Sequence, residues 1–115
     1  MNYNARQGDI IWVNFDPQTG HEQKGRRPAL VISNNTLNDL TRHGAMLCPI
    51  TNTDKGVPIH VKLDKRTQTS GVIMCDQAKI LDLAQRNAEF IEKAPPDIIF
   101  EVVDIVSGFV EVEDI

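Results

Sequence analysis

Basic side chains gather at two places in the sequence, and the chemistry they offer is the binding of anions. The groups are Lys24, Arg26 and Arg27 beside His21, and Lys62, Lys65 and Arg66 further along. A guanidinium stays charged, and its planar fork bonds two phosphate oxygens at once. The net charge of −4 argues mildly against a nucleic-acid partner, because phosphate binding usually requires a basic surface. However, residues 1–66 hold nine Lys or Arg against six Asp or Glu, so a local positive patch fits the sequence.

The signatures of common metal and cofactor enzymes are missing. The sequence has no Walker loop, no G-x-S-x-G, no H-E-x-x-H and no Rossmann glycine pattern. His21, His43 and His60 have no carboxylate or cysteine at ligand spacing, so we expect neither a metal site nor a cofactor. His60 in particular is expected to face solvent from its strand.

Cys48 and Cys75 lie 27 positions apart and lack the C-x-x-C spacing of a zinc or redox motif. We expect both to be buried, reduced thiols, which favours a cytoplasmic protein. The N-terminus carries no apolar run, and no apolar stretch approaches the roughly 20 residues of a membrane span. The sequence therefore predicts no association with a membrane.

Strand-forming stretches alternate with turn signals along most of the chain. We expect strands at 9–15, 28–33, 45–50, 58–63, 72–75, 79–83 and 88–93, and a long exposed loop at 18–27. Trp12 lies among the apolar residues of the first strand and is expected to pack in the core or in a dimer interface. Leu37 and Leu40 are three apart after a cap-like Ser-Asn-Asn, which favours a short helix over 34–42.

Following Pro95 and Pro96, apolar residues recur at spacings of three and four from Ile98 to Val106. This period predicts an amphipathic C-terminal helix over 97–107. Taken together, the elements predict one mainly β domain over residues 1–115. Its sheet should be small, antiparallel and strongly bent, closed into a barrel and covered by the terminal helix.

Four motifs occur in order along the chain: GDIIWVNFDP at 8–17, GHEQKGRRPALVIS at 20–33, PIT at 49–51 and DQAK at 76–79. In composition and interval this set resembles the MazF/PemK toxins. The likeness covers nearly the whole chain and is weakest after Asn87, where only the helical ending is shared. It implies an SH3-like barrel of the CcdB/PemK type that forms a homodimer and cuts single-stranded RNA at short sequence motifs without a metal.

The resemblance also implies site residues. Arg27 matches the family's catalytic arginine before Pro-Ala, and Thr51 matches its catalytic threonine, while Glu22 is a candidate base or a residue that orients the arginine. RNA-binding roles are expected for His21, Gln23, Lys24, Arg26, Asn52, Gln77 and Lys79. Arg26 is an additional cation at a position where the family varies.

Each of these residues also has a simpler interpretation. Arg27 can be an exposed arginine paired with Glu22 or Asp16. Thr51 can end a strand and begin a turn through its hydroxyl, and Gln77 can be a turn residue.

The functional alternative is a gyrase-binding toxin of the same fold, like CcdB, which has no nuclease activity. In such a toxin the C-terminal helix binds a topoisomerase, whereas here its apolar face is needed to cover the barrel. An SH3-like adaptor for proline-rich peptides is disfavoured, because the aromatic residues, 5% of the chain, are scattered. The RNA-cutting interpretation further requires a cognate antitoxin, which we expect to carry an acidic, disordered tail.

Overall fold

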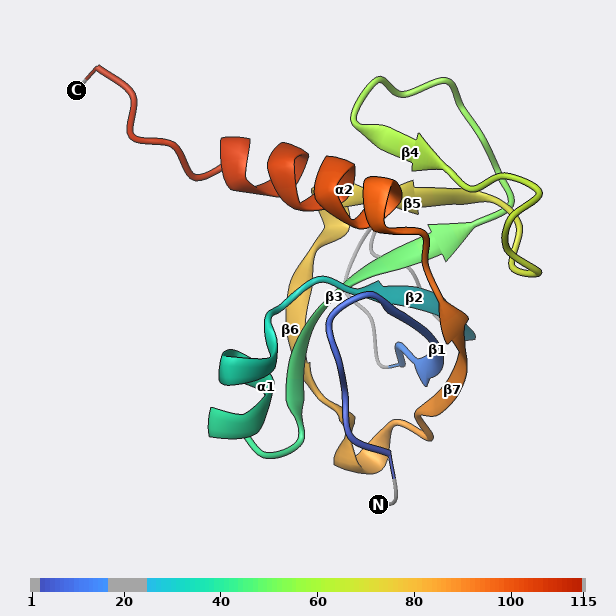
Figure 1. Ribbon diagram of the computed structural model, residues 1–115, viewed down its shortest axis with the longest axis vertical. Helices are drawn as coiled ribbons and strands as arrows, with labels where there is room; N and C mark the ends of the chain where they lie inside the picture. The colour runs from blue at the N-terminus through green and yellow to red at the C-terminus, as the bar shows by residue number, and fades with distance from the viewer. Residues whose placement is uncertain (1–2, 17–24, 115) are drawn as a thin grey trace.

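The computed structural model describes residues 3–16 and 25–114, which form a seven-stranded antiparallel sheet with two α-helices (Figure 1). The strands are β1 (Asp9–Asn14), β2 (Arg26–Val31), β3 (Gly44–Thr51), β4 (His60–Lys62), β5 (Val72–Met74), β6 (Lys79–Asp82) and β7 (Glu89–Lys93). Their order is β4-β5-β3-β2-β1-β7, and β6 pairs with β3. The helices are α1 (Asn35–Leu40) and α2 (Pro96–Gly108), with 3-10 turns η1 (Cys75–Gln77) and η2 (Leu83–Gln85). The mainly β fold with a C-terminal helix is confirmed.

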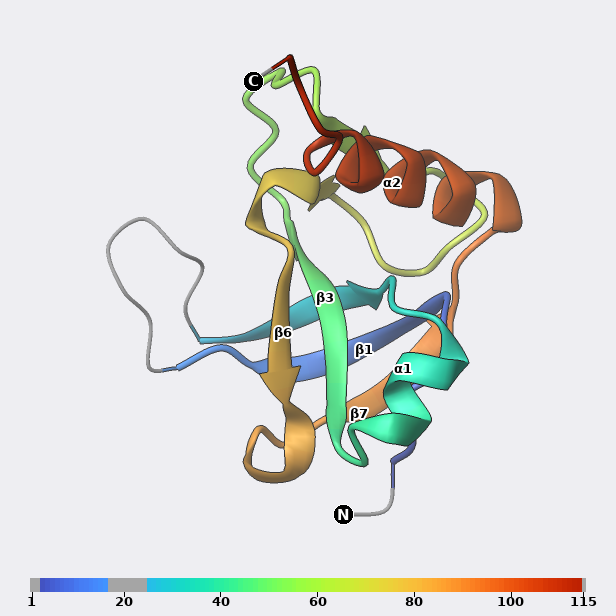
Figure 2. The ribbon, with the colours of Figure 1, turned by 90° about the vertical axis from the view of Figure 1, so that its left-hand side faces the viewer.

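The central strand β3 has neighbours on both edges, and one edge is divided between two of them. Along one edge β3 pairs with β2. Along the other it pairs first with β6 through residues 44–47 and then with β5 through Ile50 and Thr51. The turn η1 connects β5 to β6 where the edge is divided. Figure 2 shows β6 running alongside β3.

The pleat of the strands divides the core into two clusters. Ile11, Val13 and Leu47 point into the bent sheet together with Phe15. Alternate residues such as Ile10 point to the opposite face, which α2 covers at one end. Trp12 lies on this second face, beyond the helix, and is 37% exposed. Core packing of Trp12 is therefore wrong, because its two neighbours in the strand occupy the inner face, while the other expectation, a place in a dimer interface, stays a prediction.

The helix α2 covers the sheet as its apolar period predicts. Ile98 and Val102 are buried, and four of their helical neighbours pack against the same cluster. Ile99 lies against Gly8, where a Cβ atom would meet the Ile99 Cδ1 at 2.5 Å. Gly8 has a φ of +91°, and both of its backbone groups bond to neighbouring segments, its nitrogen to Val31 and its oxygen to Ala94. A side chain at this position would be strained by the positive φ and would force the Ile99 side chain to move.

The helix α1 forms where it is predicted and begins at the predicted cap, but Leu40 does not attach it to the sheet. The Asn34 side chain caps it by accepting a hydrogen bond from the Leu37 N–H at 2.9 Å. Leu40, which helped to predict the helix, is 78% exposed. The helix is instead attached through Asn38, a buried amide that bonds the Ser33 side chain at 2.5 Å and donates to the Ser33 carbonyl at 3.2 Å.

The buried carboxylate of Asp9 connects the first and last strands. It accepts hydrogen bonds from the Tyr3 hydroxyl at 2.6 Å and the Arg6 N–H at 3.1 Å, and its second oxygen pairs with the Lys93 ammonium at 2.5 Å. Burial, together with this carboxylate, raises the pKa of Tyr3. Each oxygen of Asp9 thus has a partner, as a buried charge requires.

Both cysteines are buried and unpaired, as expected. Burial raises the pKa of Cys48, and burial with the nearby Asp76 carboxylate raises the pKa of Cys75 to about 11. Of the helices in residues 3–16 and 25–114, none has the length and apolar character needed to cross a membrane.

Apolar side chains remain exposed on α2 and on the segment after it, which runs away from the sheet in Figure 1. Phe100 is 76% exposed, and Phe109, Val110 and Val112 are exposed beyond it. Exposed apolar groups of this kind favour association, so we expect a homodimer. Light scattering at micromolar concentration should give twice the chain mass of 12.9 kDa, and a monomer mass would contradict the prediction.

Candidate active site

The sheet register brings Arg27 and Thr51 to the same place. Ala29 of β2 pairs with Pro49 of β3, and the same register continued by two residues places Arg27 opposite Thr51. Both side chains line a cavity of about 570 Å³ at the end of these strands. The described residues around it are Arg27, Thr51, Thr53, Lys55, Val57, His60, Met74, Asp76 and Gln77. Most of these are polar, and Arg27 and Lys55 bring two positive charges.

Thr51 ends β3 and keeps a hydroxyl proton that it can donate. Its Oγ1 accepts a hydrogen bond from the Thr53 N–H at 3.2 Å, so the turn-forming role considered above is present. This bond uses one lone pair of the hydroxyl and leaves the proton for another acceptor. Gly71 fixes the backbone here, because a Cβ atom on it would lie 2.3 Å from the Thr51 carbonyl oxygen and its φ is +117°.

The turn η1 carries two polar side chains to the same cavity. Gln77 lines it and donates an amide hydrogen bond to the Met74 sulfur at 3.7 Å. Asp76 comes from the neighbouring position, and its side chain is 44% exposed. Because η1 spans the gap between β5 and β6, both residues are held against the end of β3.

His60 belongs to this cavity, and the expectation that it faces solvent is wrong. Its side chain is only 10% exposed, and its Nε2 lies 2.8 Å from the Asp76 Oδ1. The reason is the pairing of β4 with β5, which sets His60 opposite Met74 and so places its ring beside the start of η1. β4 itself is shorter than the predicted 58–63 strand. The sequence carries no signal for His60 as a site residue, and its only signal for Asp76 is the DQAK motif.

A loop held by Asp54 brings Lys55 to the rim. The Asp54 carboxylate accepts a hydrogen bond from the Gly56 N–H at 2.9 Å and pairs with the Lys62 ammonium at 3.2 Å. These two contacts lower the pKa of Asp54. The loop is thus attached to β4, and Lys55 stands next to the residues that β3 and η1 supply.

The structure separates Arg26 and Asn52 from Arg27. The Arg26 guanidinium pairs with the Glu89 carboxylate at 2.7 Å and lies 5.3 Å from the centre of the Trp12 ring. Asn52 lines a different cavity, of about 420 Å³, with Trp12 and Pro28. Neighbouring residues of a strand point to opposite faces, so these side chains lie on the other side of β2.

The remaining predicted site residues fall into two groups. The Lys79 Nζ lies 5.8 Å from the centre of the Phe15 ring and is not among the described residues that line the cavity of Arg27. His21, Glu22, Gln23 and Lys24 lie outside the described residues. Within the parts of the chain that the structure describes, no group of three or more metal-binding side chains occurs.

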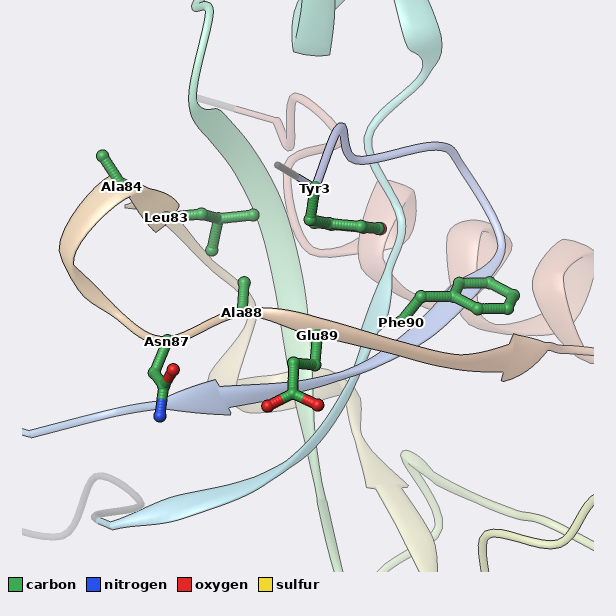
Figure 3. A pocket seen from close by; sticks show the side chains of 7 residues that line it. All are labelled: Tyr3, Leu83, Ala84, Asn87, Ala88, Glu89 and Phe90. Atoms are coloured by element: carbon green, nitrogen blue, oxygen red, sulfur yellow. The ribbon is translucent and has the colours of Figure 1, made fainter. Parts of the chain in front are cut away.

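Another hollow, of about 520 Å³, lies where η2 meets β7 (Figure 3). It is lined by Tyr3, Leu83, Ala84, Asn87, Ala88, Glu89 and Phe90. Glu89 is its only charged residue among these, and Figure 3 shows the carboxylate pointing away from Tyr3 and Leu83. None of the predicted site residues lines this hollow, so the polar cavity around Arg27 is the candidate active site.

Comparison with known proteins identifies the family of the chain. Residues 6–109 match the model of the PemK-like, MazF-like toxin of type II toxin-antitoxin systems. The chain belongs to this family. It is 34% identical to Endoribonuclease PemK of Escherichia coli over 88% of the chain and 78% of that protein. It is 42% identical to Endoribonuclease toxin MazF of Escherichia coli strain K12 over 75% of the chain and 76% of that protein.

Solved members of the family share the fold. The crystal structure of MazF from Deinococcus radiodurans superposes with a TM-score of 0.88 at 39% identity, covering 95% of this chain and 98% of that one. A structure of MazE-MazF from the same organism superposes with a TM-score of 0.81 at 33% identity, covering 97% and 100%. The family fold thus extends across the cavity that holds Arg27 and Thr51.

Removing either of these two side chains should abolish most RNA cleavage. We expect Arg27→Ala and Thr51→Ala each to reduce kcat by about 100-fold or more, because each removes a donor to a phosphate whose charge grows in the transition state. Cleavage of a labelled RNA in single-turnover kinetics measures the effect. Arg6→Ala and Thr36→Ala are matched controls, because Arg6 pairs with Asp39 and Thr36 is exposed on α1. Full activity in either test variant would place the reaction elsewhere.

Proposed function

We propose that the protein is an endoribonuclease toxin that cleaves single-stranded RNA at short sequences, without a ribosome and without a metal ion. The observation that carries the proposal is the cavity that brings together Arg27, Thr51 and Gln77. The names of the relatives agree with it, since PemK and MazF of Escherichia coli are both endoribonucleases. The alternative of a gyrase-binding toxin has no comparable support.

The proposed reaction uses a nucleophile that RNA itself supplies. The 2′-oxygen attacks the adjacent phosphorus, and the bond from phosphorus to the 5′-oxygen breaks. The 2′-OH proton goes to a base, and a proton is delivered to the leaving 5′-oxygen. The products are a 2′,3′-cyclic phosphate and a 5′-OH end. The protein needs only to move protons and neutralise the charge on the phosphorane, for which side chains suffice.

Arg27 and Thr51 have the chemistry that these steps need. The guanidinium bonds two phosphate oxygens and offers a proton donor near the leaving oxygen, and the Thr51 hydroxyl donates to the same phosphate. Lys55 adds positive charge at the rim. We propose Glu22 as the base or as the residue that orients Arg27, because it precedes the arginine in the same motif.

Base selection is proposed to come from residues next to the cleavage cavity. The Gln77 amide has donors and an acceptor for a base edge, and it lines the cavity itself. His21, Gln23 and Lys24 precede Arg27 in its motif. Lys79, the first residue of β6, lies near the Phe15 ring. Arg26 and Asn52 lie on the other face of β2, so we assign them to nucleotides further along the RNA chain.

Metal removal tests the chemistry directly. The purified protein should cut single-stranded RNA in excess EDTA at the rate seen in magnesium, because the proposed charge stabilisation comes from side chains alone. The 5′ ends should accept phosphate from a polynucleotide kinase without prior phosphatase treatment, since they carry a hydroxyl. Loss of cleavage in EDTA would contradict metal independence. Intact RNA combined with inhibition of gyrase would support the CcdB-like alternative.

We also propose a cognate antitoxin whose acidic, disordered tail covers the cavity. MazF of Deinococcus radiodurans has been solved as MazE-MazF, which supports a protein partner for this chain. Arg27 and Lys55 offer positive charge to an acidic peptide in the same place where they would meet phosphate. A disordered tail loses conformational entropy when it binds, but it can follow a long groove.

Inhibition by this antitoxin should weaken as salt rises. Exposed charges are screened over about 8–10 Å near physiological ionic strength, so the charged contacts contribute less at higher salt. Titrating the toxin with the product of the adjacent gene at increasing salt, with RNA cleavage as readout, measures this. Growth of cells that express both proteins provides the second readout. A neighbouring protein that neither binds nor restores growth would contradict the proposed control.

A further inference from the structure

The pair of His60 and Asp76 is a feature of the cavity that the proposed reaction does not use. The His60 ring is nine-tenths buried, and its Nε2 lies 2.8 Å from the Asp76 Oδ1. The two residues are 16 positions apart and come from β4 and η1. Both line the same cavity as Arg27 and Thr51. We propose that His60 is a positioning residue that holds the Asp76 carboxylate in place as a hydrogen-bond acceptor for the RNA.

The chemistry of the carboxylate determines which atom of the pair donates. An ionised carboxylate only accepts hydrogen bonds, so the His60 Nε2 carries the proton that bonds the Asp76 Oδ1. This bond fixes one oxygen of a side chain that is 44% exposed. The second oxygen of Asp76 is then available to a hydroxyl or amino group of a bound nucleotide. Gln77 follows directly in η1 and lines the same cavity, so both side chains are available to a bound RNA.

Stability does not explain the buried histidine. The His60 Nδ1 is buried and has no hydrogen-bond partner among residues 3–16 and 25–114. A buried nitrogen without a partner costs free energy, and an apolar side chain of similar size would avoid that cost. The next residue of β4, Val61, packs in the core, so β4 is attached to the sheet without any contribution from the His60 ring. A buried ring that leaves one nitrogen without a partner and holds a carboxylate in a binding cavity with the other therefore points to function.

The charges around the cavity explain why the Asp76 carboxylate has to be held in place. A phosphate in the cavity repels the Asp76 carboxylate, and Arg27 and Lys55 attract it. Without a fixed bond the side chain would turn toward these cations and compete with the RNA. The His60 hydrogen bond keeps one oxygen at the wall formed by β4, which leaves the cations to the phosphate.

This inference rests on the proposed nuclease function, and four variants test it. Cleavage of a labelled RNA substrate is measured for the wild-type protein and for each variant. The variants are His60→Leu, His60→Gln, Asp76→Asn and the double variant His60→Leu with Asp76→Asn. We expect His60→Leu and Asp76→Asn each to lower kcat/KM at least about tenfold, as small displacements in a site commonly do. Glutamine places an amide donor near the former Nε2, so His60→Gln should recover most of the activity. The double variant should be no worse than Asp76→Asn alone, because His60 acts only through the Asp76 carboxylate, which that variant has already lost.

A structural role would give a different result. Denaturant unfolding of His60→Leu should give a free energy of unfolding equal to or above that of the wild type, although cleavage falls. The matched control is the exposed His43, where His43→Leu and His43→Gln should leave kcat/KM unchanged. Nitrogen chemical shifts of the His60 ring should report an Nε2–H form that changes in Asp76→Asn.

Three outcomes would overturn the inference. They are unchanged cleavage by His60→Leu, loss of activity that follows loss of stability with no recovery in His60→Gln, and additive effects in the double variant. Failure of the wild-type protein to cut any RNA would instead reject the proposed function. In that case the ring shifts would still decide whether His60 holds Asp76.

Discussion

The division of one edge of β3 between two strands is the constraint on which the candidate site depends. β6 pairs with the first half of β3 and β5 with its last two residues, so the chain between them must cross the gap in a few residues. The short turn η1 makes this crossing, and it therefore carries Asp76 and Gln77 past the end of β3. Thr51 stands at that end, and the β2–β3 register adds Arg27. The polar residues of the cavity are thus brought together by backbone pairing before any side-chain contact is considered.

The pleat of β2 gives the two adjacent arginines different environments. Arg27 lines the cavity, while Arg26 stacks near Trp12 and pairs with Glu89 on β7. A strand cannot present two consecutive side chains to one face, so these two arginines of the basic cluster are separated in space. Among the described residues, Lys55 joins Arg27 at the cavity and comes from a separate loop.

The sequence predicts this molecule well where the signal is local or periodic. The strands, the C-terminal helix with buried Ile98 and Val102, and the burial of both cysteines follow from alternation and composition. Family motifs further indicate Arg27 and Thr51. Contacts between distant segments have no such signal: the Arg26–Glu89 pair spans 63 positions, and the His60–Asp76 pair depends on the register of β4 with β5. The same limit applies to α1, where a buried amide rather than an apolar pair attaches the helix.

The state of the two thiols has a consequence for spectroscopy. Maleimides and iodoacetamides react with the thiolate, and both Cys48 and Cys75 are buried with raised pKa values. A single new cysteine on the surface, such as Thr36→Cys on α1, would therefore react far faster than the native pair. One fluorophore or spin label can then be attached at a chosen position without replacing either native cysteine.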